Sequence, residues 1–162
     1  MTSNDHPGTA SPAPDEIPAG RPASLDALDV LVGAWDTQLR FPGGPPVTGQ
    51  GRTTFEWLEG RFFLIQRVSA VLPDGPGAIT IIGPGPAGTF RQNFFDNRGV
   101  QRVYEMSLDG GSWRLWRESP GFWQRFLGTL SADGRVITVA WEKSPDGHSW
   151  QHDFKLTNTK VR

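Results

Sequence analysis

The sequence predicts an all-β protein: a single antiparallel up-and-down β-barrel of about ten strands with a short N-terminal helix. After that helix, apolar and polar residues alternate with the period of two that half-buried strands show. The alternating segments are short and are separated by turn sequences that combine Asp or Asn with Gly, which favours hairpins between sequential strands. A meander of this length tends to close, because closure removes its exposed strand edges.

The N-terminal segment differs in composition from the rest of the chain. It is rich in Pro, Ala, Ser and Gly and has almost no large apolar residues, so it buries too little surface to offset the entropy cost of ordering. We therefore predict a disordered tail over residues 1–23 and one β-barrel domain over residues 24–162. That domain is long enough to close a core of ordinary size.

The predicted helix lies in the stretch SLDALDVLVG. Ser24 is placed to cap its beginning and Gly33 to end it. Its apolar residues fall on one face: Leu25, Leu28, Leu31 and Val32.

The strands follow in order, separated by turns such as PDGPG, DNRG, LDGG, SADG and SPDG. Their predicted ranges are about 34–41, 48–58, 61–72, 77–82, 89–96, 100–108, 112–118, 122–130, 135–143 and 148–160. Sequential pairing through these turns predicts the meander.

Alternation assigns inward faces to the last five strands. The residues predicted to point inward are Arg102, Tyr104 and Met106; Trp113 and Leu115; Phe122, Gln124 and Phe126; Ile137, Val139 and Trp141; and Trp150, His152, Phe154 and Leu156. The last group requires an unbroken strand, because one β-bulge would reverse the alternation. The carboxylates predicted to point outward are Glu105, Glu118, Glu142 and Asp153, which leaves no inward pair for acid–base hydrolysis.

Charge and composition exclude several classes of protein. Of the 16 basic and 17 acidic residues, the tail holds one arginine, two aspartates and one glutamate, which leaves 15 basic against 14 acidic residues. That balance gives no electrostatic case for binding nucleic acid or an anionic membrane. No signal peptide or membrane-spanning run is present, so we expect a cytoplasmic protein. Without cysteine, disulfides and thiolate chemistry are excluded.

Two stretches resemble a known superfamily. LVGAWDTQLRF, with Gly33-Ala34-Trp35, resembles the Gly-x-Trp opening of calycins, and WQHDFKLTNTKV resembles the ending of uncharacterised bacterial DUF1579-like and nitrobindin-like barrels. The resemblance runs from Leu25 to the C-terminus. The short link PGGPP leaves no room for the helical lid of fatty-acid-binding proteins, and the chain ends in a strand rather than the C-terminal helix of lipocalins. The ten-stranded nitrobindin-like arrangement fits better.

This resemblance implies a haem ligand. Nitrobindins hold haem through a histidine on the last strand, and His152 is the residue that matches by position. Apart from the resemblance, two roles are open for an inward His152. It either ligates haem iron or is a pocket histidine that is hydrogen-bonded to a neighbouring strand. His148 and His152 would share a zinc ion only on a helix, because on a strand they lie about 13 Å apart. We expect no metal, and no cofactor other than the implied haem.

The predicted interior combines apolar walls with a few polar groups, as a pocket for a mostly apolar small molecule requires. Arg102 and Tyr104, one strand step apart, could hold a carboxylate, with Gln66, Gln92 and Gln124 adding neutral hydrogen bonds if the third and fifth strands have the right phase. The candidate ligand-binding residues are Arg102, Tyr104, Met106, Gln124, Phe126, Trp141, Trp150, His152 and Phe154.

The sequence therefore predicts binding of a small hydrophobic or amphipathic ligand by a monomer or homodimer. One alternative is haem binding through His152 with nitric oxide or peroxynitrite chemistry. Another is a pocket that catalyses isomerisation or cyclisation, although we expect no enzyme and assign no catalytic residue. A third is a barrel filled by its own aromatic side chains.

Overall fold

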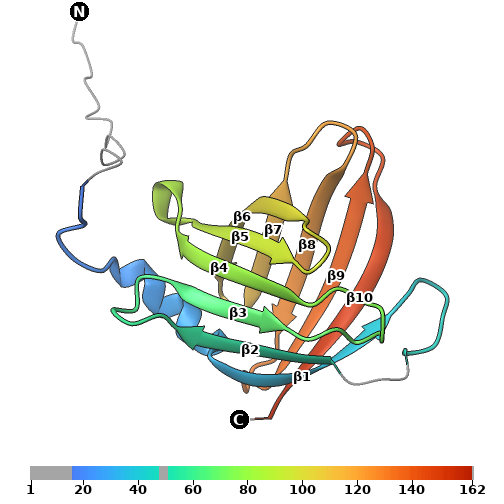
Figure 1. Cartoon of the computed structure of the whole chain (residues 1–162), viewed down its shortest axis with the longest axis horizontal. Helices are drawn as coiled ribbons and strands as arrows, with labels where there is room; N and C mark the ends of the chain where they lie inside the picture. Colours follow the sequence, from blue (N-terminus) through green and yellow to red (C-terminus); the bar gives the residue numbers. More distant parts are fainter. Residues whose placement is uncertain (1–15, 48–50, 162) are drawn as a thin grey trace, which may run out of the picture.

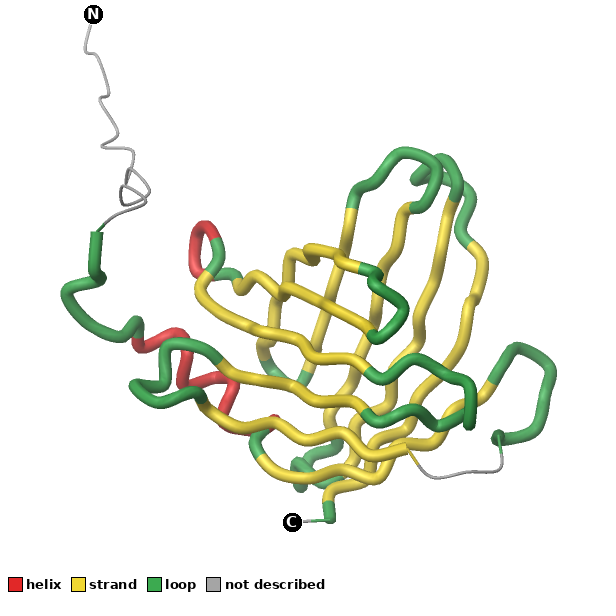
Figure 2. The backbone as a smooth tube through the Cα atoms, viewed as in Figure 1, coloured by secondary structure: helices red, strands yellow, loops and turns green. Residues whose placement is uncertain are grey.

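A closed antiparallel β-barrel of ten strands forms the body of the protein in a computed structural model, which describes residues 16–47 and 51–161 (Figures 1 and 2). Each strand pairs with its neighbours in the chain, and β1 pairs with β10 to close the ring. The predicted up-and-down barrel is confirmed. Residues 1–15 of the predicted tail, residues 48–50 of the predicted second strand and residue 162 lie outside the described residues.

Every predicted strand overlaps an observed one. The strands are β1 (Gly33–Arg40), β2 (Gly51–Trp57), β3 (Leu64–Val68), β4 (Ala78–Pro84), β5 (Phe90–Asp96), β6 (Gln101–Asp109), β7 (Ser112–Arg117), β8 (Trp123–Leu130), β9 (Val136–Ser144) and β10 (Gln151–Lys160). A short 3-10 turn, η2 (Pro86–Gly88), connects β4 to β5.

The N-terminal helix η1 (Ala23–Leu31) is a 3-10 helix. Its three leucines are spaced three residues apart, which matches the three residues per turn of this helix and places them on one buried face: Leu25, Leu28 and Leu31. The predicted cap is wrong. Pro22 occupies the capping position and no side chain caps the helix, because the helix begins before Ser24.

Helix η1 lies across the end of the barrel where β1 begins (Figure 1). The indole Nε1 of Trp35 donates a hydrogen bond of 2.8 Å to the carbonyl of Leu31, which ties the helix to β1. The leucines of η1 belong to one buried cluster with side chains from several strands, among them Trp35, Leu64, Ile82, Phe90 and Met106. This end of the barrel is therefore filled by the chain itself.

The opposite end is formed by connecting loops. Because the strands run alternately up and down, the loops after β1, β3, β5, β7 and β9 lie at the end away from η1, as the backbone trace shows (Figure 2). We call this end the rim.

The predicted alternation holds in β6 to β9 and in β10 from Phe154 onward, but it fails in the part of β10 before Phe154. A β-bulge interrupts the pairing of β10 with β9: His152 is opposite Glu142 and Phe154 is opposite Trp141, so Asp153 has no partner in the register. The bulge reverses the faces of the residues before it. His152 is exposed to solvent, whereas Asp153, predicted to point outward, lines the interior with Phe154.

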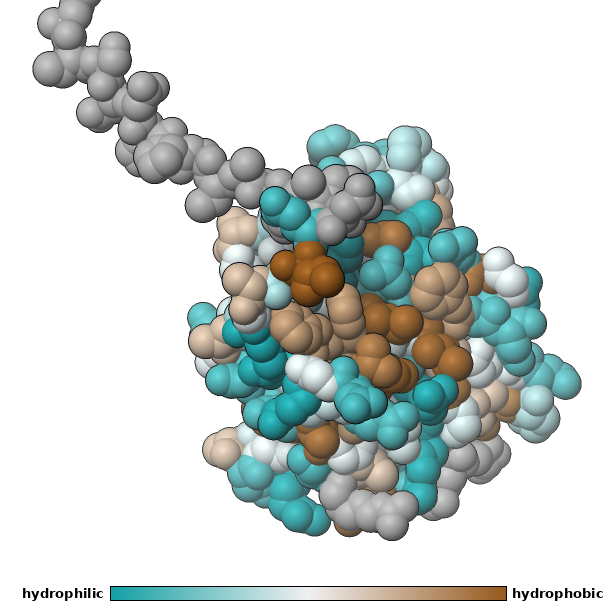
Figure 3. Space-filling view, turned by 60° about the vertical axis from the view of Figure 1, so that its left-hand side comes forward, coloured by the Kyte–Doolittle hydropathy of each residue, from teal (hydrophilic) through white to brown (hydrophobic). Residues whose placement is uncertain are grey.

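The outer surface mixes polar and apolar side chains (Figure 3). Exposed apolar residues on β4 to β6 include Ile79, Ile81, Phe95 and Val103. Within residues 16–47 and 51–161, no helix is long and apolar enough to cross a membrane.

Candidate functional site: the barrel cavity

A cavity of about 520 Å³ occupies the barrel between the rim and the core beneath it. Its rim includes Phe41, Leu72 and Phe122, which come from three different connecting loops or their edges. The volume falls in the range that holds a drug-sized molecule, and most of the lining is apolar. The side chains of the barrel therefore do not fill it entirely. This finding argues against the third alternative from the sequence, a barrel filled by its own aromatic side chains.

Aromatic rings form a continuous wall of this cavity. Trp113 packs edge-to-face against Phe126 with ring centroids 4.8 Å apart, and Phe126 packs in the same way against Trp141 at 5.1 Å. Trp141 also packs edge-to-face against Tyr104, with ring centroids 5.7 Å apart. Each side chain restricts its neighbour, so the wall is a preformed surface for a flat or flexible apolar group.

A polar cluster lies on the wall near the rim. The phenol of Tyr104 donates a hydrogen bond of 2.8 Å to Oε1 of Gln124, and Nη1 of Arg102 donates one of 3.2 Å to the same oxygen. The guanidinium of Arg102 also lies over the ring of Phe122, 5.1 Å from its centroid. Burial raises the pKa of the Tyr104 phenol above its ordinary value of 10.0, although the charge of Arg102 opposes this effect. Tyr104 is thus a hydrogen-bond donor at neutral pH.

The charge of Arg102 has no carboxylate partner in the part of the chain that the structure describes. Other arginines of the barrel do have one: Arg91 pairs with Glu105, and Arg125 pairs with Glu142. Those pairs lie on the outer face of the barrel, whereas Arg102 points into the cavity. A half-buried cation beside an apolar cavity favours an anionic group that can enter.

A second polar cluster crosses β1, β2 and β10. The hydroxyl of Thr37 lies 2.9 Å from the hydroxyl of Thr53 and donates a 2.7 Å hydrogen bond to Oδ1 of Asn158. All three residues are buried and all three line the cavity.

Two further polar atoms of the lining have no hydrogen-bond partner among the described residues. They are the amide oxygen Oε1 of Gln92 and the indole Nε1 of Trp113, both buried. Leaving such a group unsatisfied costs about 1–3 kcal/mol. The interior is therefore not optimised for stability alone.

Six of the nine predicted binding residues meet in this cavity: Arg102, Tyr104, Gln124, Phe126, Trp141 and Phe154. Gln66 and Gln92, on the two strands whose phase the sequence left open, also line it.

The other three predicted residues lie elsewhere. Met106 points inward, but it is fully buried in the core below the cavity. Trp150 and His152 precede the bulge and lie on the outer face, where the Trp150 ring stacks on the guanidinium of Arg125 at 4.1 Å. The prediction that Trp150 and His152 point inward is wrong.

The sequence also missed site residues. Thr37, Thr53 and Asn158 have the residue types of an ordinary sheet surface, and only the alternation with buried Trp35 and Phe55 places the two threonines inside. Asp153 enters the lining through the bulge, where Lys143 Nζ contacts its Oδ1 at 3.0 Å. Nothing in the local sequence indicates this pair.

The residues do not fit a haem held inside the barrel by a histidine. No described residue of the cavity lining is a histidine. The His152 side chain is 66% exposed, and its Nδ1 lies 3.7 Å from Oε1 of Glu142 on the outer face. Nor does any group of three His, Cys, Asp or Glu side chains within the described ranges have the placement to hold a metal ion.

Comparisons with known proteins show a shared fold. No protein-family model matches the chain, and no curated protein matches its sequence. Among solved structures, the crystal structure of Rv2717c from M. tuberculosis is similar with a TM-score of 0.61 and 16% sequence identity, over 88% of this chain and 99% of that one. At this identity the likeness establishes the fold alone, which in this chain is a closed ten-stranded antiparallel barrel.

Proposed function

We propose that this barrel binds a small, mostly apolar molecule that carries an acidic group. The observation that supports this most strongly is the placement of Arg102, a cation without a described carboxylate partner, at the rim of a cavity of about 520 Å³ with aromatic walls. The apolar body of the ligand would bury against Trp141 and Phe126, and burial of apolar surface would supply most of the affinity.

The polar cluster would orient the ligand. Arg102 and Tyr104 both donate to Gln124 now, so their donors already converge on one point. A carboxylate placed there accepts from the guanidinium and the phenol, and hydrogen bonds to this charged acceptor are stronger than those to the neutral amide oxygen that it replaces. Because the donors are preassembled, little conformational entropy is lost on binding.

The remaining expectations from the sequence accompany this proposal. The protein acts as a monomer or homodimer in the cytoplasm, without a cofactor and without nucleic acid or membrane as a partner. Its barrel belongs with the calycin-type proteins, as the opening around Trp35 supports, and the ending WQHDFKLTNTKV supports placing it near the nitrobindin-like and DUF1579-like members. Turnover of the ligand by isomerisation or cyclisation is not part of the proposal.

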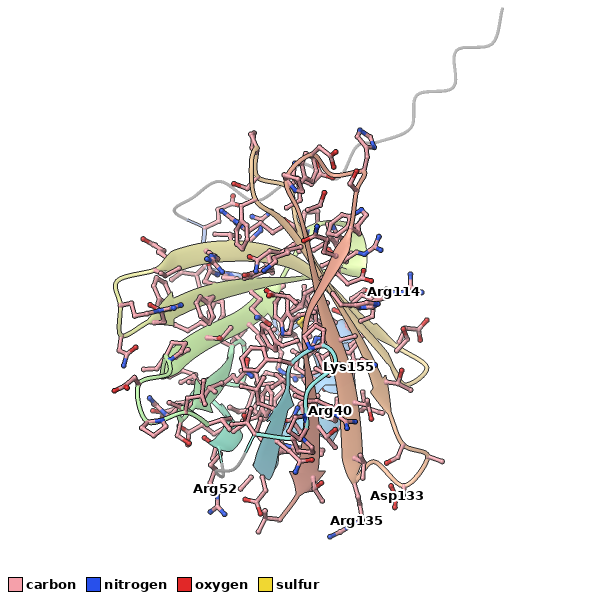
Figure 4. All side chains as sticks on the ribbon, turned by 90° about the vertical axis from the view of Figure 1, so that its right-hand side faces the viewer. Arg40, Arg52, Arg114, Asp133, Arg135 and Lys155 are labelled. Atoms are coloured by element: carbon pink, nitrogen blue, oxygen red, sulfur yellow. The ribbon has the colours of Figure 1, made fainter. Side chains whose placement is uncertain are left out.

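The test uses 1-anilinonaphthalene-8-sulfonate, an anionic aromatic probe whose fluorescence rises in apolar sites. We expect one probe to bind per chain, and Arg102→Met to weaken binding at least tenfold because the sulfonate loses its cationic partner. Arg114→Met is the matched control, because Arg114 is exposed on β7 and points away from the barrel (Figure 4). Equal affinities of the wild type and Arg102→Met would refute the proposed role of Arg102, and no binding would refute the cavity as a site.

A further inference from the structure

The two polar clusters of the cavity lie on opposite walls. Arg102 and Tyr104 are on β6, and Thr37 is on β1; in the closed ring, β6 is the fifth strand from β1 in either direction. A molecule that fills the cavity therefore meets one cluster on each side.

The clusters also differ in depth. Arg102 is the second residue of β6 after the rim turn, so it lies near the opening. Thr37 is two residues from Trp35, whose ring packs against η1 at the closed end, and Thr37 is paired in register with Asn158. The cluster of Thr37, Thr53 and Asn158 is the deeper one.

The deep cluster has an open donor and an open acceptor. A hydroxyl carries one hydrogen, and that of Thr37 is donated to Oδ1 of Asn158, so the Thr53 hydroxyl must donate to Thr37. The oxygen of Thr53 then keeps its acceptor capacity, and the amide nitrogen of Asn158 keeps two donors for which the described residues provide no acceptor. A hydroxyl group could accept from Asn158 and donate to Thr53 at once.

We infer that the ligand is a hydroxy acid, with its carboxylate at Arg102 near the rim and a neutral hydroxyl at the deep cluster. This inference depends on the proposed function and specifies its substrate class. A plain fatty acid would place methylene groups against Thr53 and Asn158. The methylene groups would displace water from these two side chains and could not replace the hydrogen bonds that the water makes. A hydroxyl group at that position replaces the hydrogen bonds of the displaced water. The cavity thus selects for the second polar group as well as for the acid.

The test compares straight-chain carboxylates of eight to twelve carbons with their ω-hydroxy counterparts by isothermal titration calorimetry. For the chain length that fits best, we expect the wild type to bind the hydroxy acid at least tenfold more tightly than the plain acid. Thr53→Val removes the acceptor for the ligand hydroxyl and Asn158→Leu removes its donor, so each should bring the ratio close to one by weakening only the hydroxy acid. The ratio of the two affinities is the informative quantity, because a general structural disturbance would weaken both ligands.

Thr138→Val is the matched control, since Thr138 is an exposed threonine on β9. It should leave the ratio at the wild-type value. If the wild type binds both acids equally well, or if the preference survives in both Thr53→Val and Asn158→Leu, the hydroxy-acid inference is wrong while binding in the cavity stands. If neither acid binds at any length, and the sulfonate probe does not bind either, the proposed function fails as well.

Discussion

The phenol of Tyr104 and the guanidinium of Arg102 donate to the same oxygen, Oε1 of Gln124, at 2.8 and 3.2 Å. One acceptor thus holds two donors together at the edge of an apolar cavity. Tyr104 and Gln124 are both buried, so the packing around them holds the arrangement in place. Two donors that converge on a single point form a site for an oxyanion.

The ionisation of Tyr104 gives the first prediction. It is the only tyrosine in the chain, so the ultraviolet absorbance of phenolate reports on this residue alone. Because burial raises its pKa, the folded protein should ionise at a higher pH than the unfolded chain, whose tyrosine titrates near 10. A titration midpoint at or below 10 in the folded protein would contradict the burial of this phenol.

The same shift affects stability at high pH. Because the pKa of Tyr104 is raised in the folded state, the phenol of the unfolded chain loses its proton first as the pH rises. The contribution of Tyr104 to the free energy of unfolding is therefore complete below about pH 10 and is lost as the pH rises through the folded-state pKa. Urea unfolding between pH 8 and 12 should therefore show a steeper loss of stability in the wild type than in Tyr104→Phe. Parallel curves would show that the phenol is not buried.

Gln92 gives a prediction that separates stability from binding. The residue is 4% exposed, and its Oε1 has no partner among the described residues. Gln92→Leu keeps the approximate volume and removes the unsatisfied oxygen, so the unliganded protein should gain about 1–3 kcal/mol in free energy of unfolding. Gln101→Leu, at an exposed position of β6, is the control and should change stability little. A destabilised Gln92→Leu would mean that ordered water satisfies the amide.

His152 provides a test of the haem alternative. Because its imidazole is on the outer face beside Glu142, His152→Ala should bind the sulfonate probe with an affinity within about twofold of the wild type. In the same experiment, added hemin should give no Soret shift that depends on His152. A shift present in the wild type and lost in His152→Ala would show that this histidine binds iron despite its exposure.

Asp146 stabilises the turn between β9 and β10. Its Oδ1 accepts hydrogen bonds from the backbone N–H groups of Ser149 and His148 and from the Ser144 hydroxyl, which hold the pKa of the carboxyl well below its usual 3.8. The stabilisation is present above about pH 4 and is lost as the pH falls through the folded-state value. Asp146→Asn should therefore lower Tm at pH 7, and the difference from the wild type should shrink at pH 2. A constant difference would assign the effect to geometry rather than charge.

The barrel could be predicted because its determinants are local. Turn residues such as those of LDGG specify hairpins, and period-two alternation gives each strand an inside and an outside, which placed Arg102, Tyr104 and Gln124 correctly. Alternation does not give depth along the barrel axis. For that reason Met106 was assigned to the pocket although it lies in the core below it.

The last strand could not be predicted because its irregularity depends on its partner. The alternation of Trp150, His152 and Phe154 looks unbroken in the sequence, and the bulge at Asp153 is visible only in the pairing with β9. The contacts that accompany it, Lys143 with Asp153 and Arg125 with Trp150, join residues that are far apart in the sequence. The period-two alternation of a single strand does not predict such contacts with its partner strand.

The most direct test of ligand binding is native mass spectrometry of the full chain purified from its own cells, with Arg102→Met produced in the same way. We predict a wild-type mass above that of the chain alone, release on denaturation of an acidic and largely apolar small molecule, and lower occupancy in Arg102→Met. A wild-type protein that carries no small molecule and remains unchanged when the cell extract is added back would contradict the proposed function.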